Sequence, residues 1–381
     1  MMNEQHRTLL AAQRIADAWS KGAVPPARTL HATAWILGRA NSTAPAPVDP
    51  VSASLVELTL AAAQGDLAKA RAVVTRGFEA SLAEGSTLLQ GLAALGSTTA
   101  EASLDLALAH PEAAIGGAMI AAGLMRAAPH RADEWLDRMR LAPSRLRLLE
   151  AVIEILLAAR DLGAPHARAE AAWLDLETTS VADSGIWWDG RLRMVSRESP
   201  PLAAEELLDA TALVGAGSLP AGPFTLVRWA RADSAAAARF VAENAPRMRV
   251  WGRWARGLTF DGALPEAARE GWTKAVSSLA PDDLAEAGQL YAVAARIGDP
   301  ARIDEVLSRV SLPPGDRVDL ASVGVRMLAR EAPDRASALL EALRAGLADE
   351  DHPGGLLDEL AVFTDVTFDV PWWSTFLPDP P

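Results

Sequence analysis

The sequence predicts an all-α fold built as a linear array of helical hairpins. Half of the 381 residues are hydrophobic, and alanine and leucine, which favour helices, outweigh β-branched and aromatic residues. Helical segments alternate with short breaks at Pro, Gly, Asp or Ser, and the period-2 pattern of a strand is almost absent. The chain also exceeds the length over which one compact core keeps growing, which favours an array.

The N-terminal region is expected to cap this array. Residues 1–40 are predicted to form a helix pair that contains Trp19 and Trp35. Residues 41–50 are rich in proline, which is typical of a semi-extended linker or a rigid loop. The chain start lacks the basic-then-apolar pattern of a secretory signal.

No membrane-spanning segment is expected. The longest uncharged apolar run, Ala113 to Met125, is shorter than the roughly 20 residues that cross a bilayer. The chain has no cysteine, which fits a reducing compartment. We therefore expect a soluble cytoplasmic protein, and the bias of its 36 basic residues to arginine, with only three lysines, is typical of a GC-rich bacterial genome.

Residues 51–350 carry a repeat of nearly constant length. Predicted hairpin turns lie 31 to 35 residues apart, 33.5 on average, at Asp66, Thr98, Arg131, Pro165, Pro200, Asp233, Leu264, Asp299 and Asp334. Four residues after each turn, seven of nine positions hold alanine; eight residues after it, all nine are apolar, with Trp173 and Trp272 the largest. Because these offsets share one helix face, each second helix is predicted to bury a small residue and then a large one.

This small-then-large spacing resembles the second helix of the tetratricopeptide repeat, over roughly residues 52 to 347. The segments 65–70 and 298–301 come closest to the turn of that repeat. The Trp, Leu, Gly and Tyr pattern of its first helix is not kept, and among nine positions expected to hold glycine only Gly123 does. The resemblance is to a degenerate repeat and implies a right-handed superhelical array, an α-solenoid, of about ten antiparallel hairpins.

Residues 351–381 differ from the repeats. One short helix is predicted from Leu356 to Val362, and an apolar tail follows it. Five aromatic residues lie in that tail: Phe363, Phe368, Trp372, Trp373 and Phe376. Two interpretations stay open: the tail either caps the last hairpin, around residues 335–347, or is a docking strip for a partner or a second copy.

Motifs of catalysis and of cofactor binding are missing from the sequence. It contains no phosphate-binding G-x-x-x-x-G-K-[ST] loop, no H-E-x-x-H zinc motif and no G-x-S-x-G nucleophile motif. The six histidines are scattered without a pair at ligand spacing. We therefore expect no enzymatic activity, no cofactor and no metal.

A candidate binding surface lies in the middle of the chain. Residues 186–274 contain twelve basic and ten acidic residues, although the whole chain has a net charge of −13, and six of the twelve tryptophans. Either the tryptophans are core and the arginines a solvated face, or both line a groove that binds acidic groups. The repeat resemblance, carried over position by position, places these residues in the groove: Asp189, Arg193, Arg197, Trp229, Arg253 and Phe260.

The function that these observations favour is a non-enzymatic scaffold that binds a partner protein or peptide with acidic groups. One alternative is a helical-repeat enzyme of the DNA-glycosylase type, although the acidic net charge opposes binding to nucleic acid. Another is a sensor or regulatory subunit of a larger bacterial system such as phage defence. A homo-oligomer is compatible with each of these functions.

Overall fold

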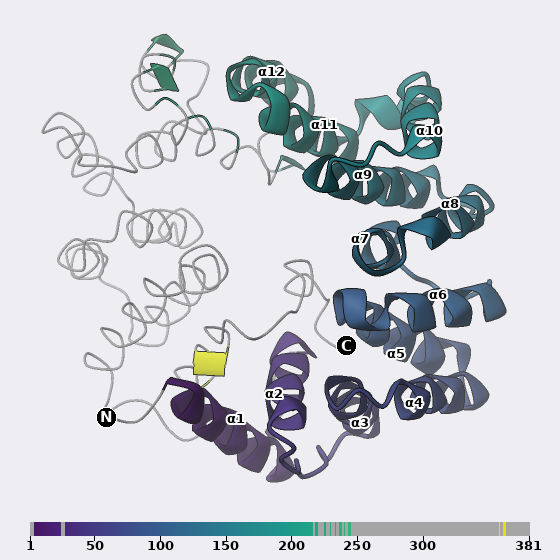
Figure 1. Cartoon of the computed structure of the whole chain (residues 1–381), viewed down its shortest axis with the longest axis vertical. Helices are drawn as coiled ribbons and strands as arrows, with labels where there is room; N and C mark the ends of the chain where they lie inside the picture. The colour runs from purple at the N-terminus through teal and green to yellow at the C-terminus, as the bar shows by residue number, and fades with distance from the viewer. Residues whose placement is uncertain are drawn as a thin grey trace, which may run out of the picture. The chain divides into compact units, whose positions relative to one another are not determined.

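The computed structural model is all-helical wherever it describes the chain. It describes residues 4–23 and 27–215, individual residues between 218 and 244, and Asp358, Ala361 and Val362. This part contains twelve α-helices, three short 3-10 helices and no strand (Figure 1), which confirms the predicted all-α class there. No helix of this part is both long and apolar enough to cross a membrane.

The chain divides into two compact units. Residues 1–181 and 352–381 form the first, and residues 182–351 form the second. The predicted N-terminal helix pair is present in the first unit as α1 (Glu4–Ser20) and α2 (Ala27–Arg39). Trp19 and Trp35 are both buried. The Pro-rich segment that follows is a fixed loop, because Trp19 Nε1 donates a hydrogen bond of 2.8 Å to the carbonyl oxygen of Pro45.

Eight further helices of the first unit follow one another along it (Figure 1). They are α3 (Pro50–Ala63), α4 (Leu67–Ala80), α5 (Leu82–Ala94), α6 (Ala100–Ala109), α7 (Gly117–Ala127), α8 (Ala132–Arg140), α9 (Arg145–Leu162) and α10 (Ala167–Glu177). The 3-10 helices Gly96–Thr99, Pro129–Arg131 and Ser180–Asp183 lie between them. Consecutive helices pack on each other, and so do α3 with α5, α5 with α7, and α7 with α9.

The predicted turns coincide with helix starts. Asp66, Thr98, Arg131 and Pro165 each lie within two residues of the start of α4, α6, α8 or α10, and Pro200 begins α12. Short polar side chains fix some of these starts: Asp66 Oδ1, for example, accepts a 3.0 Å hydrogen bond from the backbone nitrogen of Lys69. The turns predicted at residues 264, 299 and 334 lie outside the described residues.

Among the described residues, the small and large positions predicted for the second helices are buried, with one exception. The buried side chains are Ala70, Val74, Ala102, Leu106, Trp135, Met139, Ala169, Ala204, Leu208 and Ala237. The prediction is wrong for Trp173, which is only half-buried, because α10 buries Ala172 and Leu176 instead. The buried face of α10 is therefore rotated from the position that the spacing predicts.

A series of surface ion pairs links α4, α6, α8 and α10. Asp105 on α6 accepts Arg71 of α4 at 3.1 Å and Arg131, which precedes α8, at 2.9 Å. Arg168 of α10 pairs with Asp133 of α8 at 3.3 Å and also with Asp137. Exposed pairs of this kind stabilise a fold only slightly, but they show that these helices are successive neighbours.

The second unit begins with α11 (Gly185–Glu198) and α12 (Pro200–Val214), which pack on each other. Their apolar faces meet in a cluster formed by Leu192, Ala204, Leu207, Leu208, Ala210, Leu219, Trp229 and Ala237. Trp188 and Phe240 pack against its side.

Near the C-terminus, Asp358, Ala361 and Val362 are helical and buried, as the predicted short helix requires. The Asp358 carboxylate accepts hydrogen bonds from the guanidinium of Arg14 on α1, with Arg14 Nε 3.0 Å from each carboxylate oxygen. The aromatic tail after Val362 and the hairpin at residues 335–347 lie outside the described residues.

Candidate functional site

Three of the predicted groove residues lie on α11. Asp189, Arg193 and Arg197 are each half-buried, at i, i+4 and i+8 along one side of the helix. Arg197 turns back along its own helix, because its Nη1 donates a 2.9 Å hydrogen bond to the carbonyl oxygen of Arg193. The same oxygen accepts a 3.2 Å hydrogen bond from Ser196 Oγ.

Trp229, the fourth predicted residue, lies in the apolar cluster of the second unit. It is 8% exposed, and its ring centroid is 5.0 Å from that of Phe240. This placement is the one expected if the tryptophans of the region are core residues. Arg253 and Phe260 lie outside the described residues, so the groove of six residues stays a prediction.

Arg191, which the sequence did not single out, joins α11 to the next helix. Its Nε and Nη2 each donate a 2.8 Å hydrogen bond to the carboxylate of Glu206 on α12. The guanidinium carbon also lies 5.5 Å from the centroid of the Trp187 ring, within the range of a cation–π contact. Arg191 therefore links α11 to α12 through its ion pair with Glu206.

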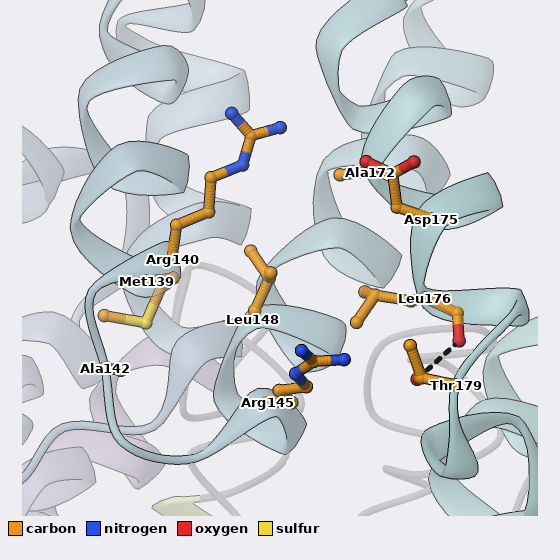
Figure 2. A pocket seen from close by; sticks show the side chains of 9 residues that line it. All are labelled: Met139, Arg140, Ala142, Arg145, Leu148, Ala172, Asp175, Leu176 and Thr179. Atoms are coloured by element: carbon orange, nitrogen blue, oxygen red, sulfur yellow. Dashed lines mark hydrogen bonds between the residues drawn. The ribbon is translucent and has the colours of Figure 1, made fainter.

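A pocket of about 240 Å³ lies in the first unit, where the end of α8, the start of α9 and the end of α10 meet (Figure 2). The turn from α8 to α9 at its edge contains Pro143 and Ser144, which favour the end of one helix and the start of the next. The residues that line the pocket are Met139, Arg140, Ala142, Arg145, Leu148, Ala172, Asp175, Leu176 and Thr179.

The two arginines of the pocket differ in how far their charge is matched. Arg145, the first residue of α9, is exposed and makes no ion pair with any residue in the described part of the chain. Arg140 has only a long contact, 3.8 Å, with Asp137 Oδ1. Asp137 also pairs with Arg168, and the hydrogen bonds that Arg168 donates to Asp137 and Asp133 raise the pKa of its guanidinium.

The rest of the pocket is mainly apolar. Met139, Ala172 and Leu176 are buried at its floor, and Asp175 lies across from Arg140 in Figure 2. Thr179 is used within the fold, since its hydroxyl donates a 2.7 Å hydrogen bond to the carbonyl oxygen of Leu176. The pocket can therefore bind a carboxylate or another anion that has an apolar group beside it.

The sequence carries a signal for this pocket that our prediction missed. The segment from residue 138 to residue 147 contains four arginines and no acidic residue, within a chain whose net charge is −13. Arginine and tryptophan occur together in residues 186–274, whereas the pocket is lined by no tryptophan. A scan for local charge alone would have found it.

The described residues include no cluster typical of a metal site. No group of three or more His, Asp or Glu side chains that could hold a metal ion occurs among them. The neighbourhood of the pocket contains arginines, one aspartate and a threonine whose hydroxyl is already used. Comparison with known protein families, with curated proteins and with solved structures gave no match for this chain.

Proposed function

We propose that this chain is a non-enzymatic interaction scaffold, built as a right-handed superhelical array of antiparallel hairpins, that binds an acidic segment of a partner protein. Helix starts at the predicted interval and the ion pairs between successive second helices support the array. The binding site is the pocket at α8, α9 and α10. Asp189, Arg193 and Arg197 on α11 stay a predicted second surface.

The observation that carries the proposal is the unpaired charge of Arg145 over an apolar floor. Arginine beside apolar side chains is typical of the few residues that dominate binding between proteins. A hydrogen bond to a charged group contributes about 1.5–3 kcal/mol, more than a neutral one. The chain has a net charge of −13, so most of its surface repels an acidic ligand. An arginine without an ion pair is therefore a place where such a ligand binds selectively.

The size of the pocket favours a peptide over a small-molecule cofactor. Its volume of about 240 Å³ is below the roughly 300–1,000 Å³ of most small-molecule sites. It has room for one apolar side chain of a partner, with a neighbouring carboxylate at Arg145. Leu141 and Leu146, which flank the arginines in sequence, are exposed and extend the apolar surface.

Selection from a phage-displayed library of random peptides on the immobilised full chain tests this function. We expect retained peptides to carry Asp or Glu beside a large apolar residue. Arg145→Glu should weaken their binding roughly ten- to a hundredfold, the equivalent of about 1.5–3 kcal/mol. The proposal would be contradicted if the chain retained no peptide, or if the retained peptides bound Arg145→Glu as tightly as the wild type.

Arg126→Glu is the matched control. Arg126 is an exposed arginine in the last turn of α7, outside the pocket, so its reversal gives the same change in net charge. Selected peptides should bind this variant like the wild type. Thermal unfolding of both variants checks that neither substitution disturbs the fold.

A further inference from the structure

Three exposed leucines recur at the repeat interval. Leu108, Leu141 and Leu174 are 40%, 82% and 61% exposed, and 33 residues separate each from the next. Leu108 lies in the last turn of α6, Leu141 directly follows α8, and Leu174 lies in the last turn of α10. We call these three residues the leucine row.

The leucine row follows one edge of the first unit. Helices joined by short connections pack antiparallel, so every second helix runs in the same direction. The ion pairs of Arg131 with Asp105 and of Arg168 with Asp133 hold α6, α8 and α10 beside one another. Arg138, near the end of α8, also donates a hydrogen bond to the carbonyl oxygen of Pro111, two residues after α6. The ends of these three helices therefore lie along one edge.

The same edge contains the arginine pocket. Leu141 lies between the pocket residues Arg140 and Ala142, and Leu174 precedes the pocket residue Asp175. Single exposed leucines are ordinary on a protein surface. In this protein they lie nine or ten residues after three successive predicted turns, whereas the predicted core positions of the same second helices are buried except for Trp173. Packing between hairpins therefore does not explain why these places are apolar.

We infer that the leucine row and the arginine pocket form one docking edge for an acidic amphipathic segment of a partner protein. Apolar side chains of that segment cover the three leucines, and one of its carboxylates meets Arg145. The charge at the centre of the edge favours this partner, because Arg145 has no ion pair within the described part of the chain and Asp175 is the one acidic residue of the pocket lining. This inference rests on the proposed function and extends it by naming the chemistry and the length of the ligand.

A helical ligand suits a row of this kind. Helices α6, α8 and α10 are alternate helices of the array and pack on the helices between them. Residues seven apart on one helix are separated by about 10.5 Å along its axis, slightly more than the roughly 8–10 Å between directly packed helices. We therefore expect a partner helix whose large apolar residues repeat at heptad spacing, with acidic residues between them.

A phage-displayed library of random peptides of about 16 residues, long enough for two helical heptads, tests the docking edge on the full chain. The variants are Leu141→Asp alone and Leu108→Asp with Leu174→Asp. We expect each to weaken the binding of selected peptides about tenfold or more, and we expect those peptides to be acidic with apolar residues at heptad spacing. Leu162→Asp is the control, because Leu162 is 55% exposed at the opposite end of α9.

The outcomes separate this inference from the proposed function. Peptides that lose binding to Arg145→Glu but bind both leucine variants normally would overturn the docking edge and leave the scaffold function standing. Failure to select any peptide would overturn both. If sedimentation instead shows a wild-type dimer that Leu141→Asp dissociates, a second copy covers the row and the inference is wrong. Unchanged thermal unfolding of each variant, expected because the leucines are exposed, excludes misfolding as the cause.

Discussion

His31 on α2 is a histidine that the fold keeps neutral. It is 2% exposed, and its Nδ1 lies 2.8 Å from Thr59 Oγ1. The Thr59 hydroxyl donates its own hydrogen to the carbonyl oxygen of Leu55 at 2.7 Å, so His31 Nδ1 is the donor to Thr59. Burial lowers the pKa of His31 from 6.5 to about 4, because a charged imidazolium would lose its hydration.

This burial predicts a loss of stability in mild acid. Above pH 6.5 both the folded and the unfolded chain hold His31 neutral, so its titration changes nothing. As the pH falls from 6.5 towards 4, His31 takes up a proton in the unfolded chain but stays neutral in the folded chain. The free energy of unfolding should drop by about 3 kcal/mol over this range, which urea unfolding at several pH values measures.

His31→Asn keeps a side-chain donor for Thr59 and removes the titrating ring. The variant should therefore lose less stability than the wild type between pH 6.5 and 4, whatever its stability at neutral pH. His130→Asn, the same substitution at an exposed histidine, is the control. Equal slopes for wild type and His31→Asn would show that the His31 ring is accessible to protons in the folded chain.

At the scale of elements, the crossing of α7 over α9 depends on Gly117. A Cβ at this position would lie 1.8 Å from the carbonyl oxygen of Arg147. The Gly117 nitrogen donates a 3.2 Å hydrogen bond to Glu150 Oε2, and its carbonyl oxygen accepts one of 2.9 Å from Trp135 Nε1. Burial raises the pKa of the Glu150 carboxyl, against the opposing effect of that backbone hydrogen bond. Helices α7, α8 and α9 thus pack together at Gly117, which has no Cβ.

Gly117→Ala should separate these helices. The contact is with backbone, which no rotamer change relieves, so we expect a loss of at least about 3 kcal/mol in the free energy of unfolding. Gly116→Ala is a close control, because a Cβ there meets nothing within 4 Å and its φ of −63° is ordinary. The control should lose less than about 1 kcal/mol. Similar unfolding curves for both variants would rule out the close crossing.

At the scale of the whole molecule, one ion pair joins residues 344 positions apart. Arg14 on α1 is 47% exposed, whereas its partner Asp358 is 2% exposed. A carboxylate this buried is costly without its cation. The pair therefore fixes the segment around residues 358–362 to the first helix of the chain.

Arg14→Met should loosen that attachment. We expect a loss of about 2 kcal/mol and faster hydrogen–deuterium exchange in the peptide that contains residues 358–362. Arg126→Met, at an exposed arginine away from this contact, should change neither quantity. If exchange near Asp358 is the same in both variants, packing of Ala361 and Val362 holds the segment instead of the ion pair.

The sequence determined the local structure of the described chain. Its helical composition and its 33.5-residue interval predicted the helical class and the starts of α4, α6, α8, α10 and α12. These features depend on local propensity, on capping residues such as Asp66 and on the burial of one helix face, all of which a single segment expresses. The half-buried position of Trp173 shows the limit, because rotation of a helix about its axis depends on its neighbours.

Only the tertiary structure decided where the charges of this protein act. Arg145 begins α9 and Arg191 lies within α11, helices that contain three arginines each, yet Glu206 neutralises Arg191 and no described residue forms an ion pair with Arg145. The sequence also gave no sign that Arg14 would meet Asp358 or that α9 would leave no room for a Cβ at Gly117. Pairing and close approach depend on the distance between segments remote in the chain, and packing alone sets that distance.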